Sequence, residues 1–349
     1  MKKLLVIVSA LLVLVGCGSS STPQETLRVF NWGEYINLDL IKEFEKENNV
    51  KVIYELFESN EAMYTKLQGG EKYDIIIPSD YMVQRMNEEG LLLEIDYSKI
   101  PNYSNVIDSL KNRHMDPEGK YTVPYFWGSV GILYNTTEVS SSEVESKGWN
   151  IFRDEAYKGR TYYYDSERDA FMVALKALGY SMNTTDEKQI EEAYNWLVEM
   201  NKNMDTVYVT DDVIDNMING IKDIAVVYSG DASFIISENP DMAYYEPKEG
   251  TNVWVDTMVI YKDAPNPELA HKWMDFILRE SSLEAIAEYV GYTSPSQNVI
   301  DTLTGPGGTY ESVSSYVPRV GYANDEEFFY DADMKVILST YWQKVKASN

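Results

Sequence analysis

Aromatic and carboxylate side chains recur together at points where the sequence predicts that strands end. In the motif FNWGEYI, residues 30–36, Trp32 and Tyr35 lie on either side of Glu34, directly after a strand-like run. Aromatic faces attract ammonium groups and cover methylene carbons. Carboxylates accept charge-assisted hydrogen bonds from ammonium groups. The combination therefore indicates a site for an organic cation that also has an apolar part.

Similar clusters follow other predicted strands, and we expect them to converge if two α/β units face each other across a cleft. One tryptophan beside one aspartate is more often a core residue next to a surface residue, so the prediction depends on the recurrence. A looser cluster joins Tyr228 to Asp231. The main clusters are Trp32-Gly33-Glu34-Tyr35, Ser79-Asp80-Tyr81, Tyr164-Asp165-Ser166 with Arg168-Asp169, and Trp254-Val255-Asp256.

Strand-like and helix-like runs alternate at the start of the fold, which is typical of a parallel α/β sheet with crossover helices. Ligands of such sheets gather at the carboxyl ends of the strands. The expected strands are 27–32, 50–56 and 73–80, and the expected helices are 38–49, 60–70 and 80–90. A second α/β unit is expected to contain 162–180, 187–203, 223–236, 251–263, a two-part helix over 268–292 and a last helix over 324–348.

The first residues predict export and a lipid anchor. Lys2 and Lys3 precede an apolar run over 4–15, which has the length of a signal-peptide core and is short for a membrane span. The run ends in Leu14-Val15-Gly16-Cys17, which matches a bacterial lipobox. We therefore expect a signal peptide over 1–16, a lipidated Cys17 and a flexible tether over 17–26.

Composition narrows the possible functions. Without Lys2 and Lys3, 28 of the 30 Lys and Arg side chains remain against 56 Asp and Glu, a formal net charge of −28. This charge argues against nucleic acids and anionic lipid surfaces as partners, and it favours cationic ligands in a general way. Cys17 is the only cysteine, which excludes a disulfide framework within the chain. A chain of 349 residues predicts two lobes, and its 28 tyrosines suggest an aromatic-lined site.

The sequence gives little support for catalysis. Its two histidines, His114 and His271, lie in no Gly-x-Ser-x-Gly, His-Glu-x-x-His or Cys-x-x-Cys motif. The GPGG stretch over 305–308 predicts a turn and lacks the context of a phosphate loop. We expect no enzyme activity, no metal and no cofactor, although paired carboxylates leave glycosidase-type chemistry open.

Nearly the whole chain resembles the substrate-binding proteins of polyamine ABC importers, of the spermidine/putrescine-binding type. The matching stretches are FNWGEYI, VIYELFESNEAMYTKLQGGEKYDIIIPSDYMV, IPNYSNV, VPYFWGSVGILYN, ALGYSMNTTDEKQIEEAYN, WVDTMVI and GYTSPS. The resemblance implies a type II periplasmic-binding-protein fold, in which two α/β lobes, each a mixed sheet flanked by helices, close on a ligand in the cleft between them. It implies a first lobe over 27–133 plus 257–323 and a second over 134–256 plus 324–349, with the C-terminal helix on the second lobe.

The resemblance also implies which residues contact the polyamine. Glu34 would bind one terminal ammonium group, while Trp254 and Asp256 would bind the other end. The family has a glutamine contact near the C-terminus that has no clean match here, where Phe328 or its neighbours occupy that region. With Asp80 and Ser166 added from the clusters, the candidate ligand-binding residues are Trp32, Gly33, Glu34, Tyr35, Ser79, Asp80, Tyr81, Ser166, Asp169, Tyr228, Trp254, Asp256 and Tyr292.

One departure from the family bears on ligand choice. Spermidine binders can have an acid three residues before the position of Asp169, where this chain has Ser166. The change removes one carboxylate from the middle of the site, unless Asp165 or Glu167 replaces it. Because a triamine needs a partner for its secondary ammonium group and a diamine does not, the loss favours putrescine over spermidine.

The sequence thus predicts a lipid-anchored, monomeric receptor that captures putrescine, spermidine or both and delivers them to an ABC permease. Its excess of carboxylates over a diamine's charge would pair in part with Arg168. Three alternatives stay open at this point. They are the same fold with another organic cation or small solute, a lipoprotein glycosidase, and a sensor or adhesin that uses the same binding lobes.

Overall fold

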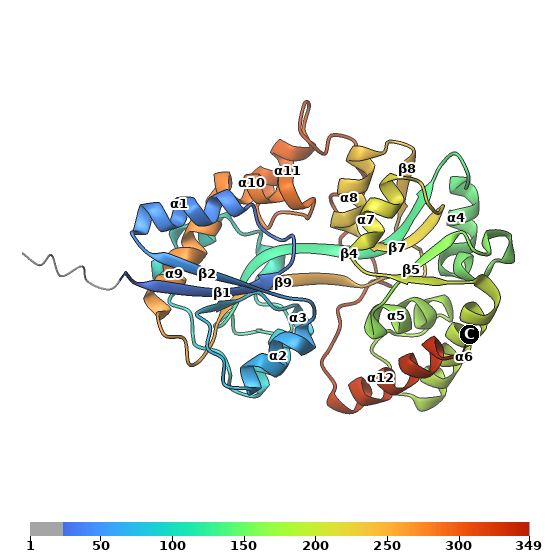
Figure 1. Ribbon diagram of the computed structural model, residues 1–349, viewed down its shortest axis with the longest axis horizontal. Helices are drawn as coiled ribbons and strands as arrows, with labels where there is room; N and C mark the ends of the chain where they lie inside the picture. Colours follow the sequence, from blue (N-terminus) through green and yellow to red (C-terminus); the bar gives the residue numbers. More distant parts are fainter. Residues whose placement is uncertain (1–23, 349) are drawn as a thin grey trace, which may run out of the picture.

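The computed structural model describes residues 24–348 (Figure 1). The predicted signal peptide, Cys17 and the tether up to residue 23 lie outside the described residues. Thr26, the last residue of the predicted tether, already belongs to the first strand. Between residues 24 and 348, no helix is long and apolar enough to cross a membrane.

One mixed sheet runs through the described chain. Its nine strands are β1 (Thr26–Trp32), β2 (Lys51–Phe57), β3 (Ile75–Ile76), β4 (Val123–Asn135), β5 (Thr161–Tyr164), β6 (Val207–Val209), β7 (Ile224–Tyr228), β8 (Met242–Tyr245) and β9 (Val253–Ile260). Their order is β2-β1-β3-β9-β4-β7-β5-β6, and β8 pairs with β4. β1 is parallel to β2 and β3, as the alternation of strands and helices predicts. β9 is antiparallel to β3 and β4, so the expected mixed sheet is confirmed.

β4 and β9 run side by side across the middle of the molecule and connect its two ends (Figure 1). β4 pairs with β9 from Val123 to Ser129, and then with β7 from Val130 to Tyr134. The same strand therefore contributes to both halves of the sheet. The division into lobes 27–133 plus 257–323 and 134–256 plus 324–349 stays a prediction.

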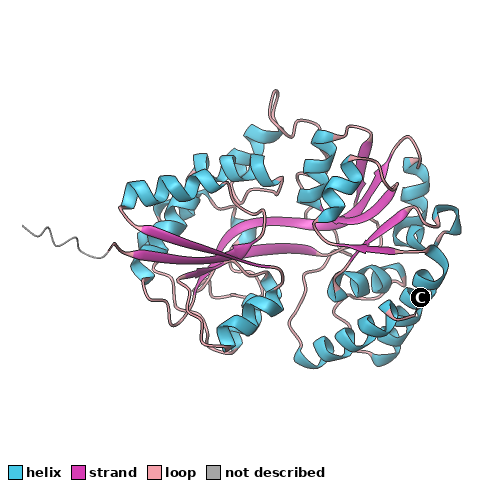
Figure 2. Ribbon diagram, in the orientation of Figure 1, coloured by secondary structure: helices cyan, strands magenta, loops and turns pink. Residues whose placement is uncertain are grey.

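Helices cover both faces of the sheet at each end (Figure 2). At the end that contains β1, β2 and β3, they are α1 (Leu38–Asn48), α2 (Asn60–Gln68), α3 (Asp80–Glu88), α9 (Pro267–Ile277), α10 (Glu280–Val290) and α11 (Gln297–Thr304). At the end that contains β5, β6 and β7, they are α4 (Ser141–Lys147), α5 (Glu167–Ala177), α6 (Glu187–Met204), α7 (Asp212–Ile218), α8 (Ser229–Glu238) and α12 (Ala332–Lys346). Short 3-10 helices cover Tyr97–Lys99, Pro101–Asn105, Asp108–Leu110, Gly148–Arg153 and Glu155–Tyr157.

Polar side chains at several helix starts accept hydrogen bonds from amide groups of the first turn, which have no partner within the helix. The Ser59 hydroxyl accepts from the Ala62 amide at the start of α2 (3.1 Å). The Ser166 hydroxyl accepts from the Asp169 amide at the start of α5 (3.4 Å). Ser166 and Asp169, two candidate ligand-binding residues, are thus held together by a cap.

The prediction of a helix over 324–348 is wrong for its first part, since α12 begins only at Ala332. Glu326 forms a bridge with the start of β9 instead: its amide donates to the Thr251 carbonyl, and its carbonyl accepts from the Val253 amide (both 2.9 Å). The Asp331 side chain then caps α12 by accepting from the Met334 amide (2.9 Å). Pairing with a distant strand, which local sequence does not reveal, replaces the helical hydrogen bonds of this segment.

The expected docking of the C-terminal helix on the second half of the fold is confirmed. Tyr341 of α12 stacks on Tyr194 of α6, with ring centroids 4.7 Å apart. Trp342 packs edge-on against Tyr208, with ring centroids 5.0 Å apart. These aromatic contacts hold α12 beside α5 and α6 (Figure 1).

Candidate functional site

A row of aromatic rings crosses the middle of the molecule. Tyr35 lies edge-on to Tyr292 (ring centroids 5.3 Å apart), and Tyr292 lies edge-on to Trp254 (5.4 Å). The row continues from Trp254 to Tyr228 (6.0 Å) and from Tyr228 to Tyr164 (4.9 Å). Tyr164 and Tyr228 end the parallel strands β5 and β7, and Tyr35 follows β1, so strand ends supply much of the row. The predicted convergence of these clusters is therefore present in the structure.

Asp256 on β9 is a buried carboxyl group at the Tyr35 end of the row. It is 6 % exposed, and its Oδ1 atom is buried without a hydrogen-bond partner. Ser79 pairs with Asp256 through an antiparallel backbone bridge, which places α3 next to β9. Burial raises the pKa of the Asp256 carboxyl group to about 7, although the neighbouring Ser79 and Tyr35 hydroxyls oppose the rise. A cation placed here would stabilise the ionised form.

Asp169 is a second such group, at the Tyr228 end of the row. It is 4 % exposed, and its Oδ2 atom accepts a hydrogen bond from the Tyr228 hydroxyl (2.8 Å). Its Oδ1 atom is buried without a partner. Burial raises the pKa of Asp169, while Ser166, Tyr228 and the charge of Arg168 lower it. Asp169 therefore also offers a free acceptor to a cation.

Asp231 lies in the first turn of α8 and accepts a hydrogen bond from the Tyr292 hydroxyl (2.7 Å). Burial raises the pKa of Asp231 to about 7. The sequence grouped Asp231 with Tyr228 but gave no reason to include it among the candidates. Its position two residues into a helix that follows a strand end was the available signal.

Asp80 has a different role in the structure. It is 1 % exposed, and its two oxygens accept from the amides of Tyr81 (2.7 Å) and Val255 (3.4 Å). Burial raises the pKa of Asp80 to about 7, and the nearby charge of Asp256 adds to the rise. Asp80 thus joins the start of α3 to β9, and its carboxylate is engaged with the backbone.

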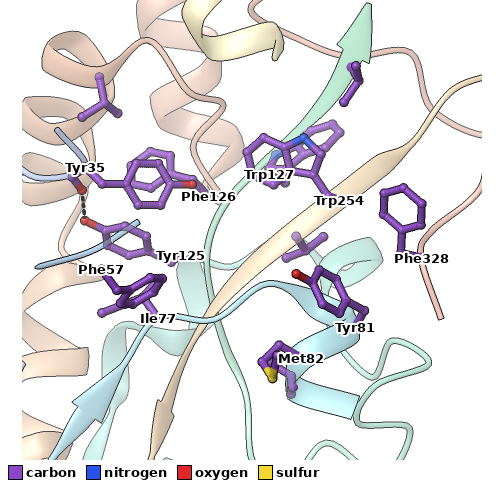
Figure 3. Close-up of a cluster of buried hydrophobic side chains, with 14 of the residues drawn as sticks. Tyr35, Phe57, Ile77, Tyr81, Met82, Tyr125, Phe126, Trp127, Trp254 and Phe328 are labelled. Atoms are coloured by element: carbon purple, nitrogen blue, oxygen red, sulfur yellow. Dashed lines mark hydrogen bonds between the residues drawn. The ribbon is translucent and has the colours of Figure 1, made fainter. Parts of the chain in front are cut away.

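Ser79 and Tyr81 are both oriented by Asn60, which the sequence did not single out. The Asn60 side-chain amide donates to the Ser79 hydroxyl (3.1 Å) and to the Tyr81 hydroxyl (3.0 Å). Phe328 lies edge-on to Tyr81, with ring centroids 6.4 Å apart, and both rings face the part of the fold that contains Trp254 (Figure 3). Residues of α3, β9 and the segment before α12 therefore meet here.

The residues of the first motif, FNWGEYI, lie in different environments in the structure. Trp32 packs against Phe57 (ring centroids 4.5 Å apart), and its indole N–H is buried without a partner. Gly33 and Glu34 are exposed. Glu34 has a left-handed backbone conformation (φ 46°), and its Oε2 atom accepts from the Tyr289 hydroxyl (3.3 Å). Tyr35 thus joins the aromatic row, while Glu34 lies at the molecular surface.

Neither neighbour of Ser166 supplies the carboxylate that the family can place there. Asp165 accepts from the Trp342 indole N–H (3.1 Å) and from the Lys346 ammonium group (2.9 Å). Glu167 accepts from the Ser339 hydroxyl. Both carboxylates are therefore engaged with α12.

Other features of the described residues lie away from this cluster. Two surface hollows contain none of the candidate residues; one is lined by Asn201, Lys202, Asp205 and Thr206, and the other lies between residues 176–181 and 323–326. Residues 24–348 contain no group of three or more His, Asp or Glu side chains suited to hold a metal ion. His271 is a packing residue that accepts from the Asp96 amide (3.0 Å).

Gly230→Ala tests whether the aromatic row is tightly packed. A Cβ atom at residue 230 would lie 2.2 Å from the Tyr292 ring, which Tyr35 and Trp254 hold from other sides. We expect a loss of about 1–3 kcal/mol in the free energy of unfolding, measured in urea, because such overpacking forces side chains to shift. Ser237→Ala on the exposed part of the same helix is the control, and equal stability of the two variants would contradict the packing.

The described chain matches the family model "Bacterial extracellular solute-binding protein" over residues 39–310. It is 34 % identical to the spermidine/putrescine-binding periplasmic protein of Escherichia coli (strain K12), over 92 % of each chain. Its fold is similar to the spermidine/putrescine ABC transporter substrate-binding protein of Streptococcus pneumoniae (TM-score 0.78, 35 % identity, 93 % of this chain and 99 % of that chain). It is also similar to the TpPotD lipoprotein of Treponema pallidum (TM-score 0.79, 27 % identity, 92 % of this chain and 99 % of that chain).

Proposed function

Because the chain belongs to the bacterial extracellular solute-binding protein family, we propose that it captures a linear polyamine and delivers it to the permease of an ABC importer. The named relatives support a spermidine or putrescine ligand. In this proposal, the two halves of the fold act as lobes that close on the ligand, and the protein works as a monomer. The family consists of solute-binding proteins, and we infer that the carboxyl groups bind without catalysing a reaction.

One observation carries the proposal: Asp169 and Asp256 are buried beside aromatic rings, and each has a carboxyl oxygen without a hydrogen-bond partner. A buried charge is unfavourable unless it is paired. Ammonium groups at the two ends of a diamine would each supply donors, and the rings between them would cover the methylene carbons. A neutral sugar would supply hydroxyl donors but no charge.

The proposed roles follow the geometry. Asp256, with Ser79 and Tyr35 beside it, would bind one ammonium group. Asp169, oriented by Tyr228, would bind the other.

We assign five of the remaining candidates to packing and to the approach of the ligand. Trp254 and Tyr292 would pack on the methylene carbons between the two ends. Trp32, Gly33 and Glu34 would complete the site at its outer edge as the ligand enters.

Calorimetric titration of the chain without residues 1–17 tests the function. Putrescine, cadaverine, spermidine and spermine are compared with butylamine, which has one ammonium group, and with choline. We expect tight binding of at least one polyamine and much weaker binding of butylamine, since one carboxylate would stay unpaired. Binding of choline alone would favour another organic cation on the same fold, and absence of heat from all polyamines would reject the proposal.

Ser166→Asp is expected to raise affinity for spermidine relative to putrescine. The variant supplies the carboxylate that spermidine binders can have three residues before Asp169, and that Asp165 and Glu167 do not replace because they contact α12. Aspartate is also a good helix cap, so the start of α5 should remain intact. We expect the ratio of the two affinities to change by about tenfold, as one charge-assisted hydrogen bond would give.

Ser140→Asp is the matched control for this prediction, because Ser140 caps α4 in the same way through the Glu143 amide (3.3 Å). It should leave the affinity ratio unchanged. If the wild-type protein already bound spermidine much more tightly than putrescine, the proposal that Ser166 favours putrescine would be wrong.

We also infer that Cys17 carries the lipid and that the following residues tether the fold to the membrane. The lipobox supports this inference, and a relative in Treponema pallidum is itself called a lipoprotein. The mass of the N-terminal peptide from membrane-extracted protein tests it. An unmodified thiol at Cys17 would reject the anchor.

A further inference from the structure

Glu61 joins the two halves of the fold close to the proposed binding residues. It lies in the first turn of α2, in the half that contains β1, and its side chain is 31 % exposed. Its Oε1 atom lies 3.9 Å from Arg168 Nη2 and 3.8 Å from the Lys335 ammonium group. Arg168 belongs to α5 and Lys335 to α12, both in the other half (Figure 1). One carboxylate therefore faces two cations across the boundary between the halves.

Arg168 also covers an aromatic ring of the other half. Its guanidinium carbon lies 3.8 Å from the centroid of the Tyr81 ring, on α3, and its side chain is 10 % exposed. A guanidinium group is attracted to an aromatic face, and the attraction is stronger where water is excluded. The Tyr81 hydroxyl donates to Glu61 Oε1 (3.5 Å), so the ring and the carboxylate contact the same cation. These contacts link α5 and α12 to α2 and α3.

The two cations are poorly placed for direct recognition of a polyamine. Arg168 directly precedes Asp169, which would bind an ammonium group in the proposed function. A positive charge near a bound cation weakens binding by repulsion. Contacts that form only when the halves are close together can favour binding without involving the ligand. Arg168 and Lys335 both make contacts of this kind with Glu61.

The residues next to Glu61 and Arg168 in the chain belong to the proposed site or orient it. Asn60, which precedes Glu61, donates a hydrogen bond to the Tyr81 hydroxyl (3.0 Å). Asp169, which follows Arg168, has a buried carboxyl oxygen without a partner. An arrangement that brings Arg168 to Glu61 therefore also brings Asp169 into position beside the other half.

We propose that Glu61, Arg168 and Lys335 form a clasp that holds the two halves together and thereby positions both ends of the site around the ligand. This inference rests on the proposed polyamine function. A ligand that binds only the closed form has an apparent dissociation constant equal to the intrinsic value divided by the fraction of closed protein. The clasp raises this fraction, so it strengthens the binding of every ligand by the same factor.

Calorimetric titration of Arg168→Gln with putrescine and spermidine tests the clasp by the sign of the change. We expect the affinity for both ligands to fall about threefold to fivefold, as the loss of a partly exposed ion pair gives, with an unchanged ratio. If Arg168 acted mainly by repelling the ligand, its loss would raise the affinity, and most for spermidine, which carries more charge. A rise or an unchanged affinity would overturn the inference.

Arg153→Gln is the matched control for Arg168→Gln. Arg153 also lies over a ring, that of Trp196 (5.4 Å), and pairs with Glu199, but all three residues belong to the same half of the fold. Its loss removes an arginine without removing a contact between the halves, so the affinity should not fall. An equal fall in both variants would overturn the clasp.

A double-mutant cycle between Glu61 and Lys335 makes the test specific to their contact. Lys335→Gln alone should lower the affinity about threefold. Added to Glu61→Gln, it should cause no further fall, because the carboxylate that Lys335 faces is already neutral. Additive losses would mean that the two residues act separately, and would overturn the inference.

Distances between spin labels in the ligand-free protein separate the clasp from the proposed function. The chain without residues 1–17 contains no cysteine, so Gln68→Cys in α2 and Gln343→Cys in α12, both at exposed positions, give two unique labels. We expect Glu61→Gln to increase the share of long distances. An unchanged distribution would overturn the clasp even if polyamines bind. Longer distances without polyamine binding by the wild type would retain the clasp and reject the proposed function.

Discussion

Asp256→Asn is expected to lower polyamine affinity by about 100-fold while leaving the ligand-free protein at least as stable as the wild type. Removing one partner of a buried, hydrogen-bonded charge pair typically weakens binding by about 2–5 kcal/mol, and each 1.4 kcal/mol is tenfold. The substitution keeps the shape of the side chain and removes only its charge. Calorimetric titration and urea unfolding of the same preparations measure both quantities.

The expected stability of Asp256→Asn follows from the lack of a hydrogen-bond partner for one carboxyl oxygen of Asp256. Its Oδ1 atom is buried without a donor, and burial raises the pKa of the group to about 7. In the ligand-free protein above pH 7, the ionised carboxylate is therefore destabilising, and a neutral amide relieves that effect. Most point mutations lower stability, typically by about 1 kcal/mol, so an unchanged or higher free energy of unfolding at a buried position would be distinctive.

Asp116→Asn is the matched control, because Asp116 is a buried aspartate with a purely internal role. It is 1 % exposed, and its carboxylate accepts from the amides of Lys120, Tyr121 and Thr122 and from the Thr122 hydroxyl. Its neutralisation should lower the free energy of unfolding by about 1–3 kcal/mol and leave the affinity unchanged. If Asp256→Asn behaved like Asp116→Asn, Asp256 would be a structural residue and the proposed site would lose one end.

The convergence of the aromatic and acidic clusters could be predicted because it depends on local patterns. Strand-like runs end at Tyr164 and Tyr228 and just before Tyr35, and the ends of strands in one sheet meet along an edge. The order of strands and helices was equally visible for α1, α2 and α3. The resemblance to a known family supplied the type of fold, which local patterns alone left open.

Contacts between distant parts of the chain could not be predicted in this way. Arg168 and Tyr81 are far apart in sequence, and nothing near either residue indicates that a guanidinium group covers the ring. The bridge between Glu326 and β9 likewise replaced a predicted helix because of a partner more than seventy residues away. Tertiary pairing determined both features.

Backbone conformation explains why the sequence predicted the position of Tyr35 but not that of Glu34 in the motif FNWGEYI. Its spacing places Trp32, Glu34 and Tyr35 together, but Glu34 has a positive φ of 46° that turns the chain between the two aromatic residues. The turn brings Tyr35 into the aromatic row and leaves Glu34 exposed beside Tyr289. A non-glycine residue in this conformation is uncommon, and composition gives no sign of it.

The affinity for polyamines is expected to rise steeply with pH between pH 5 and 8. Of the two proposed ligand carboxyl groups, burial raises the pKa of Asp256 to about 7 and also raises the pKa of Asp169, so Asp256 is largely protonated at pH 5 in the ligand-free protein. Aliphatic ammonium groups stay protonated over the whole range. The ligand binds the ionised carboxylate, so a protonated group must release its proton on binding. For each proton released, the affinity falls about tenfold per pH unit below pH 7.

Proton release can be measured directly by titrating at pH 6 in buffers with different ionisation enthalpies. We expect one to two protons, roughly, to leave on binding by the wild type, and fewer for Asp256→Asn. Asp80 should contribute less than its pKa of about 7 suggests, because backbone amides already bind its carboxylate. Binding that is independent of pH and of buffer would contradict pairing of the ligand with these carboxyl groups.

The stability of the ligand-free protein should depend on pH in the opposite direction. For Asp231 and Asp256 the folded-state pKa, about 7, lies above the usual value of 3.8, so between these values the folded state holds more protons than the unfolded state. Their contribution to the free energy of unfolding is therefore fully present below pH 3.8 and is lost as the pH rises through 7. Urea unfolding of the wild type and of Asp256→Asn at pH 5.5 and 8 measures this contribution. The change in the free energy of unfolding between the two pH values should be smaller in the variant. If stability falls with pH while affinity rises, the same carboxyl groups destabilise the ligand-free protein and bind the cation. If stability and affinity change with pH in the same direction, other residues cause the pH dependence.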